Sequence, residues 1–405
     1  MCGWPAWERA GYGRAGTVQD RGGRTDVIIS DSFDAGNIEV VDVSDPQHVR
    51  LQIRKDHNSD HYQWFYFRVA GVRATALNLR IENAGAASYP GGWPGYHACY
   101  SYDRRTWRRV AQTSYADGVL TIGHTPELDT VYYAYFAPYS MEQHHDLVAR
   151  SLGSPRVRHE VLGKTLDGQD LDLLHVSEGE RGSKARCWIF ARQHPGESMA
   201  EYLMEGVLAR LLDQSDPIAR ELLRKAEFWI VPNMNPDGSR RGHLRTNAAG
   251  ANLNREWLEP SMDRSPEVFL VRERMRATGL EFALDVHGDE GLPYNFISGA
   301  DGVESVTGST RALQAKYEAE LMAANPDFQM QHGYTEAEPG KANMTMATNW
   351  IADAFGALAM TLEMPFKDNA DAPDSEHGWS PERCRKLGEG VLSALLRVVD
   401  ELPRR

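Results

Sequence analysis

The feature that most constrains the fold is a change of sequence pattern near Pro138. Beyond it, short apolar runs that could form buried strands alternate with longer segments of helical spacing. The apolar runs are 187–191, 227–233, 281–287 and 356–364. Near-continuous apolar strands that alternate with helices are typical of a sheet covered by helices on both faces. We therefore expect an α/β domain over residues 139–405.

Three helices can be placed within that domain from their spacing and end signals. The segment 140–154 begins with a serine N-cap and stops near a glycine, and 198–212 follows the first apolar run. The segment 380–402 has Ser380 as its N-cap and Pro381 at the first helical position, where the missing N–H costs nothing.

Residues 26–138 show many short segments in which apolar and polar residues alternate, and 62–69 and 131–136 are rich in aromatic residues. A period of two over many closely spaced strands predicts an N-terminal antiparallel β-sandwich domain. Residues 1–25 are rich in glycine and arginine and lack periodicity, so we expect a disordered leader there.

Charge and cysteine content exclude several classes of protein. Lysine and arginine number 44 against 57 aspartates and glutamates, a net charge of −13, whereas a general nucleic-acid binder needs a basic surface. No stretch approaches the ~20 apolar residues of a membrane span. The four cysteines form no CxxC pair, which disfavours a cysteine zinc site and a disulfide scaffold. We expect a cytoplasmic protein without nucleic-acid or membrane partners; its oligomeric state is unknown from the sequence.

Residues suited to metal chemistry follow the expected strands. His194 and Glu197 come directly after one strand, His287 ends another, and Glu363 ends a third. In α/β sheets, sites form at the carboxyl ends of the strands, so these side chains should meet. Two imidazoles and one carboxylate are the ligand set of a catalytic zinc with one open position, and His194, Glu197 and His287 can supply it.

The His-x-x-Glu pattern alone is weak evidence, because four of the 14 histidines begin such a tetrapeptide: His124, His175, His194 and His287. His194 differs in its context. It follows an apolar strand, and Pro195-Gly196 predict a sharp turn that aims both side chains at one point.

With these motifs in order, the chain resembles a known family. HPGE (194–197), NPDG (235–238), GANLNREW (250–257), a strand-end histidine and TLEM (361–364) together resemble the M14-type zinc metallocarboxypeptidases. The N-terminal β-domain makes it most similar to a bacterial-like member of the cytosolic carboxypeptidase subfamily. The resemblance implies a mixed, mainly parallel eight-stranded sheet between helices, one Zn²⁺ per chain, and hydrolysis of C-terminal residues from peptides or proteins.

The resemblance also implies roles for residues outside the metal group. Glu363 matches the catalytic glutamate, which takes a proton from water and passes it to the leaving amine. Arg245 matches the arginine that stabilises the developing oxyanion. Asn254 and Arg255 match the pair that binds the terminal carboxylate, for which a guanidinium fork is well suited.

Three departures from the family pattern stand out. Asn252 occupies a position where the family usually has an aspartate that orients a zinc histidine. No tyrosine stands at the substrate-binding position before the catalytic glutamate; Lys341 and Tyr334 are the candidates to replace it. The segment 342–356 has no lysine or arginine, which leaves preference for acidic C-terminal residues open.

Two other readings remain. Zinc N-acyl amino acid deacylases of related fold share the two-histidine, one-glutamate site and the catalytic glutamate. A catalytically weak, zinc-dependent peptide-binding protein is the third reading, and the uncharged amide at Asn252 gives it some weight.

Overall fold

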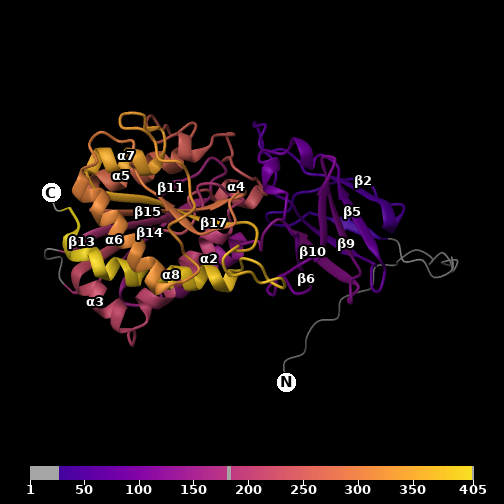
Figure 1. The fold of residues 1–405 in the computed structure, drawn as a ribbon, viewed down its shortest axis with the longest axis horizontal. Helices are drawn as coiled ribbons and strands as arrows, with labels where there is room; N and C mark the ends of the chain where they lie inside the picture. Colours follow the sequence, from indigo (N-terminus) through magenta and orange to yellow (C-terminus); the bar gives the residue numbers. More distant parts are fainter. Residues whose placement is uncertain (1–26, 180–183, 404–405) are drawn as a thin grey trace, which may run out of the picture.

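The computed structural model describes residues 27–179 and 184–403, and these form three β-sheets with helices packed on one of them. The expected leader at 1–25 lies outside the described residues. Figure 1 shows strands of the first part of the chain gathered at one end of an elongated molecule, with the C-terminus at the other.

The N-terminal part consists of two five-stranded sheets. The first has the order β1 (Ile28–Ser30), β4 (Tyr66–Ala70), β10 (Thr130–Ala134), β6 (Cys99–Ser101) and β7 (Arg108–Arg109). The second has the order β2 (Glu39–Asp42), β3 (Val49–Gln52), β5 (Leu77–Ile81), β9 (Val119–His124) and β8 (Gln112–Ala116). Three short 3-10 helices lie between these strands in the sequence: η1 (Pro46–His48), η2 (Ala84–Ala86) and η3 (Pro90–Gly92). The expected N-terminal antiparallel domain is confirmed, with one exception: among the pairs of these two sheets, β3 and β5 run parallel.

The third sheet is mixed. Its order is β11 (Val157–Lys164), β12 (Asp170–Val176), β14 (Ala226–Val231), β13 (Ala185–Ala191), β15 (Phe282–Asp289), β17 (Leu358–Pro365) and β16 (Phe296–Ser298). The four strands β14, β13, β15 and β17 are parallel, and the strands outside them pair antiparallel. The described residues supply seven strands to this sheet, one fewer than the eight expected.

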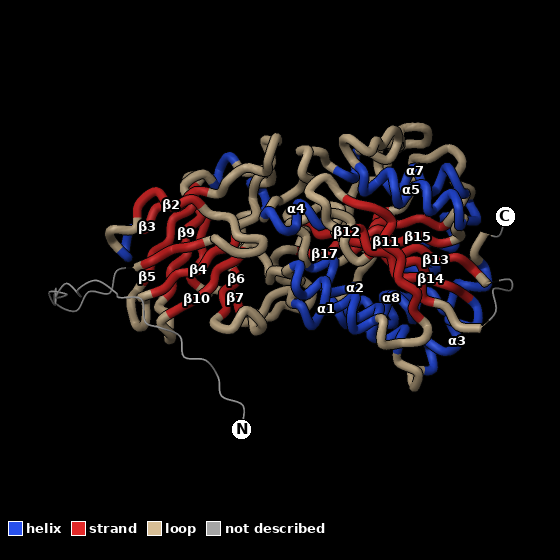
Figure 2. Tube along the Cα trace, turned by 180° about the vertical axis from the view of Figure 1, so that it is seen from behind, coloured by secondary structure: helices blue, strands red, loops and turns tan. Residues whose placement is uncertain are grey.

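Helices cover both faces of this sheet (Figure 2). One face carries α1 (Met141–Ser151), α2 (Met199–Leu212), α3 (Pro217–Lys225), α6 (Gly308–Ala324) and α8 (Pro381–Val398), while α5 (Pro266–Thr278) and α7 (Ala347–Phe355) lie on the other. The remaining short elements are α4 (Pro236–Arg241), η4 (Leu253–Arg255) and η5 (Val399–Glu401). As expected from the sequence, the Ser380 side chain caps α8 and Pro381 is its first residue. No described helix has the length and apolar character needed to cross a membrane.

The two faces of the sheet explain the near-continuous apolar strands. Along β13, Cys187 and Ile189 belong to the core under α2 and α8, whereas Trp188 and Phe190 belong to the core under α5 and α7. Successive side chains of a strand point to opposite faces, so a strand between two helical layers must be apolar at every position.

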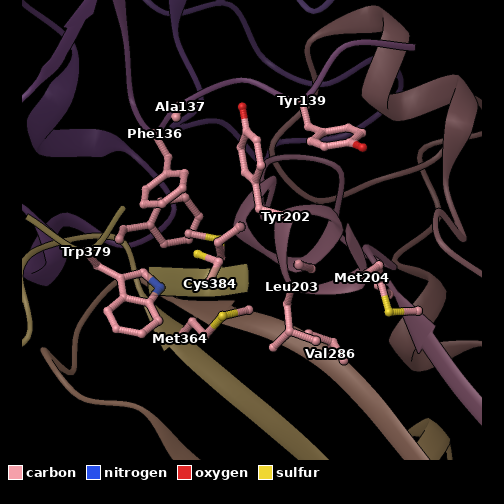
Figure 3. Close-up of a cluster of buried hydrophobic side chains, with 14 of the residues drawn as sticks. Phe136, Ala137, Tyr139, Tyr202, Leu203, Met204, Val286, Met364, Trp379 and Cys384 are labelled. Atoms are coloured by element: carbon pink, nitrogen blue, oxygen red, sulfur yellow. The ribbon is translucent and has the colours of Figure 1, made fainter. Parts of the chain in front are cut away.

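The core under α2 and α8 continues into the N-terminal sandwich. Figure 3 shows Tyr139, which follows β10, beside Tyr202 of α2, with Phe136 and Ala137 of the same segment on the other side of the Tyr202 ring. Tyr139 and Tyr202 meet edge to face with ring centroids 4.8 Å apart, and the Tyr202 hydroxyl donates to the Pro138 carbonyl at 2.8 Å. The segment around Pro138 is therefore a packed junction.

Candidate active site

The candidate site lies at the carboxyl ends of three neighbouring parallel strands. His194 stands three residues beyond β13, His287 lies near the end of β15, and Glu363 lies near the end of β17. His287 and Glu363 are direct partners in the pairing of β15 with β17. The sheet thus brings together residues that are far apart in the sequence, as the strand-end argument predicts.

A tight turn after β13 presents His194 and Glu197. It begins at Arg192, whose φ of 61° is in the left-handed region that disfavours a side chain, and buried contacts hold it there. The Arg192 guanidinium donates to the Pro195 carbonyl at 3.0 Å and to Glu201 at 2.6 Å. Gly196 fits because a β-carbon there would lie 2.9 Å from the Leu244 carbonyl oxygen.

Three potential ligands converge in a buried group. The Nδ1 atoms of His194 and His287 lie 2.7 and 2.8 Å from the two carboxylate oxygens of Glu197, and 3.2 Å from each other. All the ligand atoms lie within 4.8 Å of one another, and the three residues are almost completely buried.

The opposite ring nitrogens have their own hydrogen-bond acceptors. His194 Nε2 lies 3.0 Å from Asn252 Oδ1, and His287 Nε2 lies 2.8 Å from Asp285 Oδ2. An acceptor at Nε2 holds the proton there and leaves the Nδ1 lone pair free, as in many metal-binding histidines. The expected contact of Asn252 with a histidine of the metal group is thus present.

The electrostatics of the group also suit a cation. Burial, together with the charge of Arg245, lowers the pKa of His194 to about 3, which keeps its imidazole neutral. Burial opposes a charge on His287 as well, but the carboxylates of Asp285 and Glu197 outweigh it and raise its pKa. A positive charge is therefore stabilised between these carboxylates, and the two nitrogens and one carboxylate fit a zinc ion.

Asp285 is a residue that the sequence reasoning missed. It accepts from His287 and also from Gln193 Nε2 at 2.6 Å, and Gln193 Oε1 in turn accepts from the Trp257 indole at 2.8 Å. A signal was present, because residues two apart on a strand share a face and Asp285 precedes His287 by two positions.

The metal group opens into a cavity of about 490 Å³, and the other expected residues line it: Arg245, Asn254, Arg255, Tyr334 and Glu363. Lys341 does not; it lines a neighbouring cavity of about 540 Å³ that also contacts Tyr334. Three lining residues, Tyr89, Gly91 and Gly92, come from the N-terminal sandwich, where the sequence indicated no site residue.

Glu363 is suited to proton transfer. Its side chain is buried, and one carboxylate oxygen has no hydrogen-bond partner within the described residues. Burial, partly countered by His287 and reinforced by the charge of Glu197, raises its pKa to about 8. The Tyr334 hydroxyl lies 3.2 Å from Glu363 and 2.6 Å from Asp289, and the residue as a whole is 48% exposed.

The candidate carboxylate-binding residues lie together on η4. The Asn254 amide oxygen accepts from the Ala347 backbone at 2.9 Å, and its NH₂ group can donate to an anionic ligand. Arg255 Nη1 donates to the Asn254 carbonyl at 2.6 Å, and its other N–H groups can bind an anion. Arg245 lines the same cavity, with its guanidinium 5.3 Å from the centre of the Tyr89 ring.

Comparisons with known proteins identify the family. The model of the cytosolic carboxypeptidase N-terminal domain matches residues 29–136, and that of the zinc carboxypeptidases matches residues 149–373. An uncharacterized protein of Zymomonas mobilis is 52% identical over 375 residues, which cover 93% of this chain and 97% of that protein. Cytosolic carboxypeptidase 4 of Mus musculus is 29% identical over 290 residues, which cover 60% of this chain but 25% of the mouse protein.

A solved structure agrees with these matches. A metallo-carboxypeptidase from Pseudomonas aeruginosa, in complex with (2-guanidinoethylmercapto)succinic acid, has a TM-score of 0.91 and 45% identity, covering 93% of this chain and all of that one. The chain therefore belongs to the M14 zinc carboxypeptidases and carries, at residues 29–136, the N-terminal domain of the cytosolic carboxypeptidases.

Proposed function

We propose that this member of the family is a zinc-dependent metallocarboxypeptidase that releases C-terminal residues from peptides or proteins. The observation that carries the proposal is the meeting of His194, Glu197 and His287 beside Glu363 in a cavity that two arginines also line. One Zn²⁺ on these three residues would supply a Lewis acid and lower the pKa of water.

The other residues of the cavity have separate tasks. Glu363 takes the proton of the attacking water and hands it to the leaving amine, for which a raised pKa and an unpaired oxygen are suited. Arg245 stabilises the oxyanion that develops at the scissile carbonyl. Its guanidinium has no hydrogen bond or ion pair with residues 27–179 or 184–403, so it is available for that charge.

Recognition of the substrate terminus is assigned to η4. Arg255 and the Asn254 NH₂ group bind the free α-carboxylate, because both can donate hydrogen bonds to it and bonds to a charged carboxylate are strong. Tyr334 and Lys341 are proposed as substrate-contacting residues; the Tyr334 hydroxyl is already beside Glu363, whereas Lys341 lines the adjoining cavity. We expect Lys341 in the adjoining cavity to favour substrates with an acidic C-terminal side chain, so Lys341→Ala should reduce that preference.

The P. aeruginosa enzyme was solved with a succinic acid derivative that carries a guanidino group. Because its carboxylates suit Arg255 and Asn254, we expect the same compound to compete with peptide substrates here. The names of the cytosolic carboxypeptidase relatives support a cytoplasmic location, which we also propose.

The direct test is digestion of a peptide library with varied C-termini by the zinc-loaded protein, read by mass spectrometry. Stepwise loss of C-terminal residues, abolished by a chelator and restored by zinc, is the expected result. Hydrolysis of N-acyl amino acids, with the peptides left uncleaved, would favour the N-acyl amino acid deacylase hypothesis instead. Peptide binding without any product would favour the non-catalytic reading.

A further inference from the structure

A loop of the N-terminal sandwich that contains Asp56 hydrogen-bonds to the backbone of residues 244–246, the segment that carries Arg245. Asp56, which is 3% exposed, accepts from three successive backbone N–H groups: Leu244 at 2.7 Å, Arg245 at 2.8 Å and Thr246 at 2.9 Å. The Thr246 hydroxyl donates to the same carboxylate at 3.1 Å. Both carboxylate oxygens are engaged, and charge-assisted bonds of this kind are strong.

Two neighbouring contacts fix the same loop on the same segment. The His57 backbone N–H donates to His243 Nε2 at 3.1 Å, and His243 Nδ1 donates to the Thr246 carbonyl at 2.9 Å. Gly250 has a φ of 81°, and a β-carbon there would lie 2.4 Å from the Asn58 carbonyl oxygen. The loop and the segment therefore meet backbone to backbone, without room for a side chain between them.

The segment also connects to the metal group and to a second sandwich residue. The Leu244 carbonyl accepts from the Gly196 N–H at 2.9 Å, next to Glu197. The Arg245 side chain extends over the Tyr89 ring, a cation–π contact that orients the guanidinium. The backbone and the side chain of Arg245 are thus both held by residues of the sandwich.

We propose that the sandwich is part of the catalytic apparatus, with Asp56 and Tyr89 as positioning residues that hold Arg245 for the oxyanion. This inference rests on the proposed function. A carboxylate is needed at Asp56 because an asparagine would turn an NH₂ group toward backbone donors and leave some of them unpaired. A displaced backbone would move the guanidinium, and small displacements of a catalytic group are costly in rate.

The test measures kcat and KM of zinc-loaded Asp56→Asn on a peptide substrate, alone and combined with Arg245→Ala. We expect Arg245→Ala to lower kcat on the order of 10²-fold and Asp56→Asn to lower it about tenfold or more, with KM less changed. Because Asp56 acts through Arg245, adding Asp56→Asn to Arg245→Ala should cause little further loss. Asp60→Asn, in the same loop with its side chain 97% exposed, is the matched control and should behave as wild type.

Losses that multiply in the double variant, or a wild-type kcat in Asp56→Asn, would overturn the inference. Should Asp56→Asn fail to fold, Tyr89→Leu replaces it in the same comparison, alone and combined with Arg245→Ala. Losses of kcat that multiply in that double variant would likewise overturn the inference. An active wild type with an unaffected Asp56→Asn refutes only the positioning role, whereas a wild type that cleaves no peptide refutes the proposed function and this inference together.

Discussion

Asn252 shows how much a single side chain can matter to the metal group. Its amide oxygen accepts from His194 Nε2 at 3.0 Å and so fixes the ring that presents Nδ1 to the metal position. We predict that Asn252→Ala lowers zinc affinity about 10- to 100-fold, whereas Asn252→Asp, which keeps the acceptor, does not lower it. Competition with a chelating dye measures both. Wild-type affinity in the alanine variant would contradict this role.

Arg255 is the residue that should distinguish a carboxypeptidase from an endopeptidase. We predict that Arg255→Ala raises KM for peptides with a free C-terminal carboxylate, because the guanidinium contributes a charge-assisted bond to it. Steady-state kinetics on matched free and C-terminally amidated peptides measure the effect. An equal change for both peptides would show that Arg255 does not bind the terminal carboxylate.

At the scale of elements, a buried polar cluster joins α1, β12 and α2 behind the active site. His144 of α1 lies 2.6 Å from Glu201 of α2 and 3.0 Å from Asp172 of β12. Burial opposes a charge on His144, but these carboxylates outweigh it and raise its pKa to about 9. Glu201 also binds Arg192, so the cluster supports the turn that carries His194.

The raised pKa of His144 predicts a specific pH dependence. Since the folded-state pKa of about 9 exceeds the unfolded value of about 6.5, the stabilisation is complete below pH ~6.5 and is lost as the pH rises through 9. Below pH ~6.5, protonation of His144 stabilises the folded protein by on the order of 3 kcal/mol. Urea unfolding of wild type and His144→Asn should therefore show a difference that is larger at pH 6 than at pH 10.

His145→Asn is the matched control for this experiment, because His145 is the exposed neighbour on the same helix. It should change the free energy of unfolding little at either pH. A difference between wild type and His144→Asn that is constant over this pH range would contradict the charged state of His144.

Elements and their order could be predicted where the signal is local. The apolar runs predicted β13, β14, β15 and β17, and the strand-end argument predicted the meeting of His194, His287 and Glu363. The parallel pairing of β3 with β5 could not be predicted, because both strands alternate alike whichever way they pair. The contact of Asp56 with Arg245 joins positions 189 residues apart, and no local sequence pattern predicts such a long-range contact.

At the scale of the whole molecule, the two parts of the chain share one core. Tyr135 stacks on Phe366 with ring centroids 4.5 Å apart, and the Arg109 guanidinium donates to the carbonyls of Phe366 and Trp379. We predict a single cooperative unfolding transition by calorimetry, because neither part can open without exposing the shared core. Two separable transitions would contradict this account of the junction.

The net negative charge of the whole molecule disfavours binding of an anionic substrate, and the positive groups of the site counter it locally. A protein of net charge −13 is proposed to bind terminal carboxylates, and it places Arg245 and Arg255 in one cavity with the candidate metal group. A short-range field of this kind can oppose the sign of the whole molecule.

If Glu363 moves the proton in the proposed zinc-dependent peptidase, removing its carboxylate should greatly reduce turnover without loss of zinc. Zinc content and peptide hydrolysis are measured on the wild type and on Glu363→Gln, a nearly isosteric change that removes the base. We predict equal zinc content in both proteins and a loss of kcat of about 10²- to 10⁴-fold in the variant. A Glu363→Gln protein that holds zinc and still cleaves peptides at the wild-type rate would contradict it.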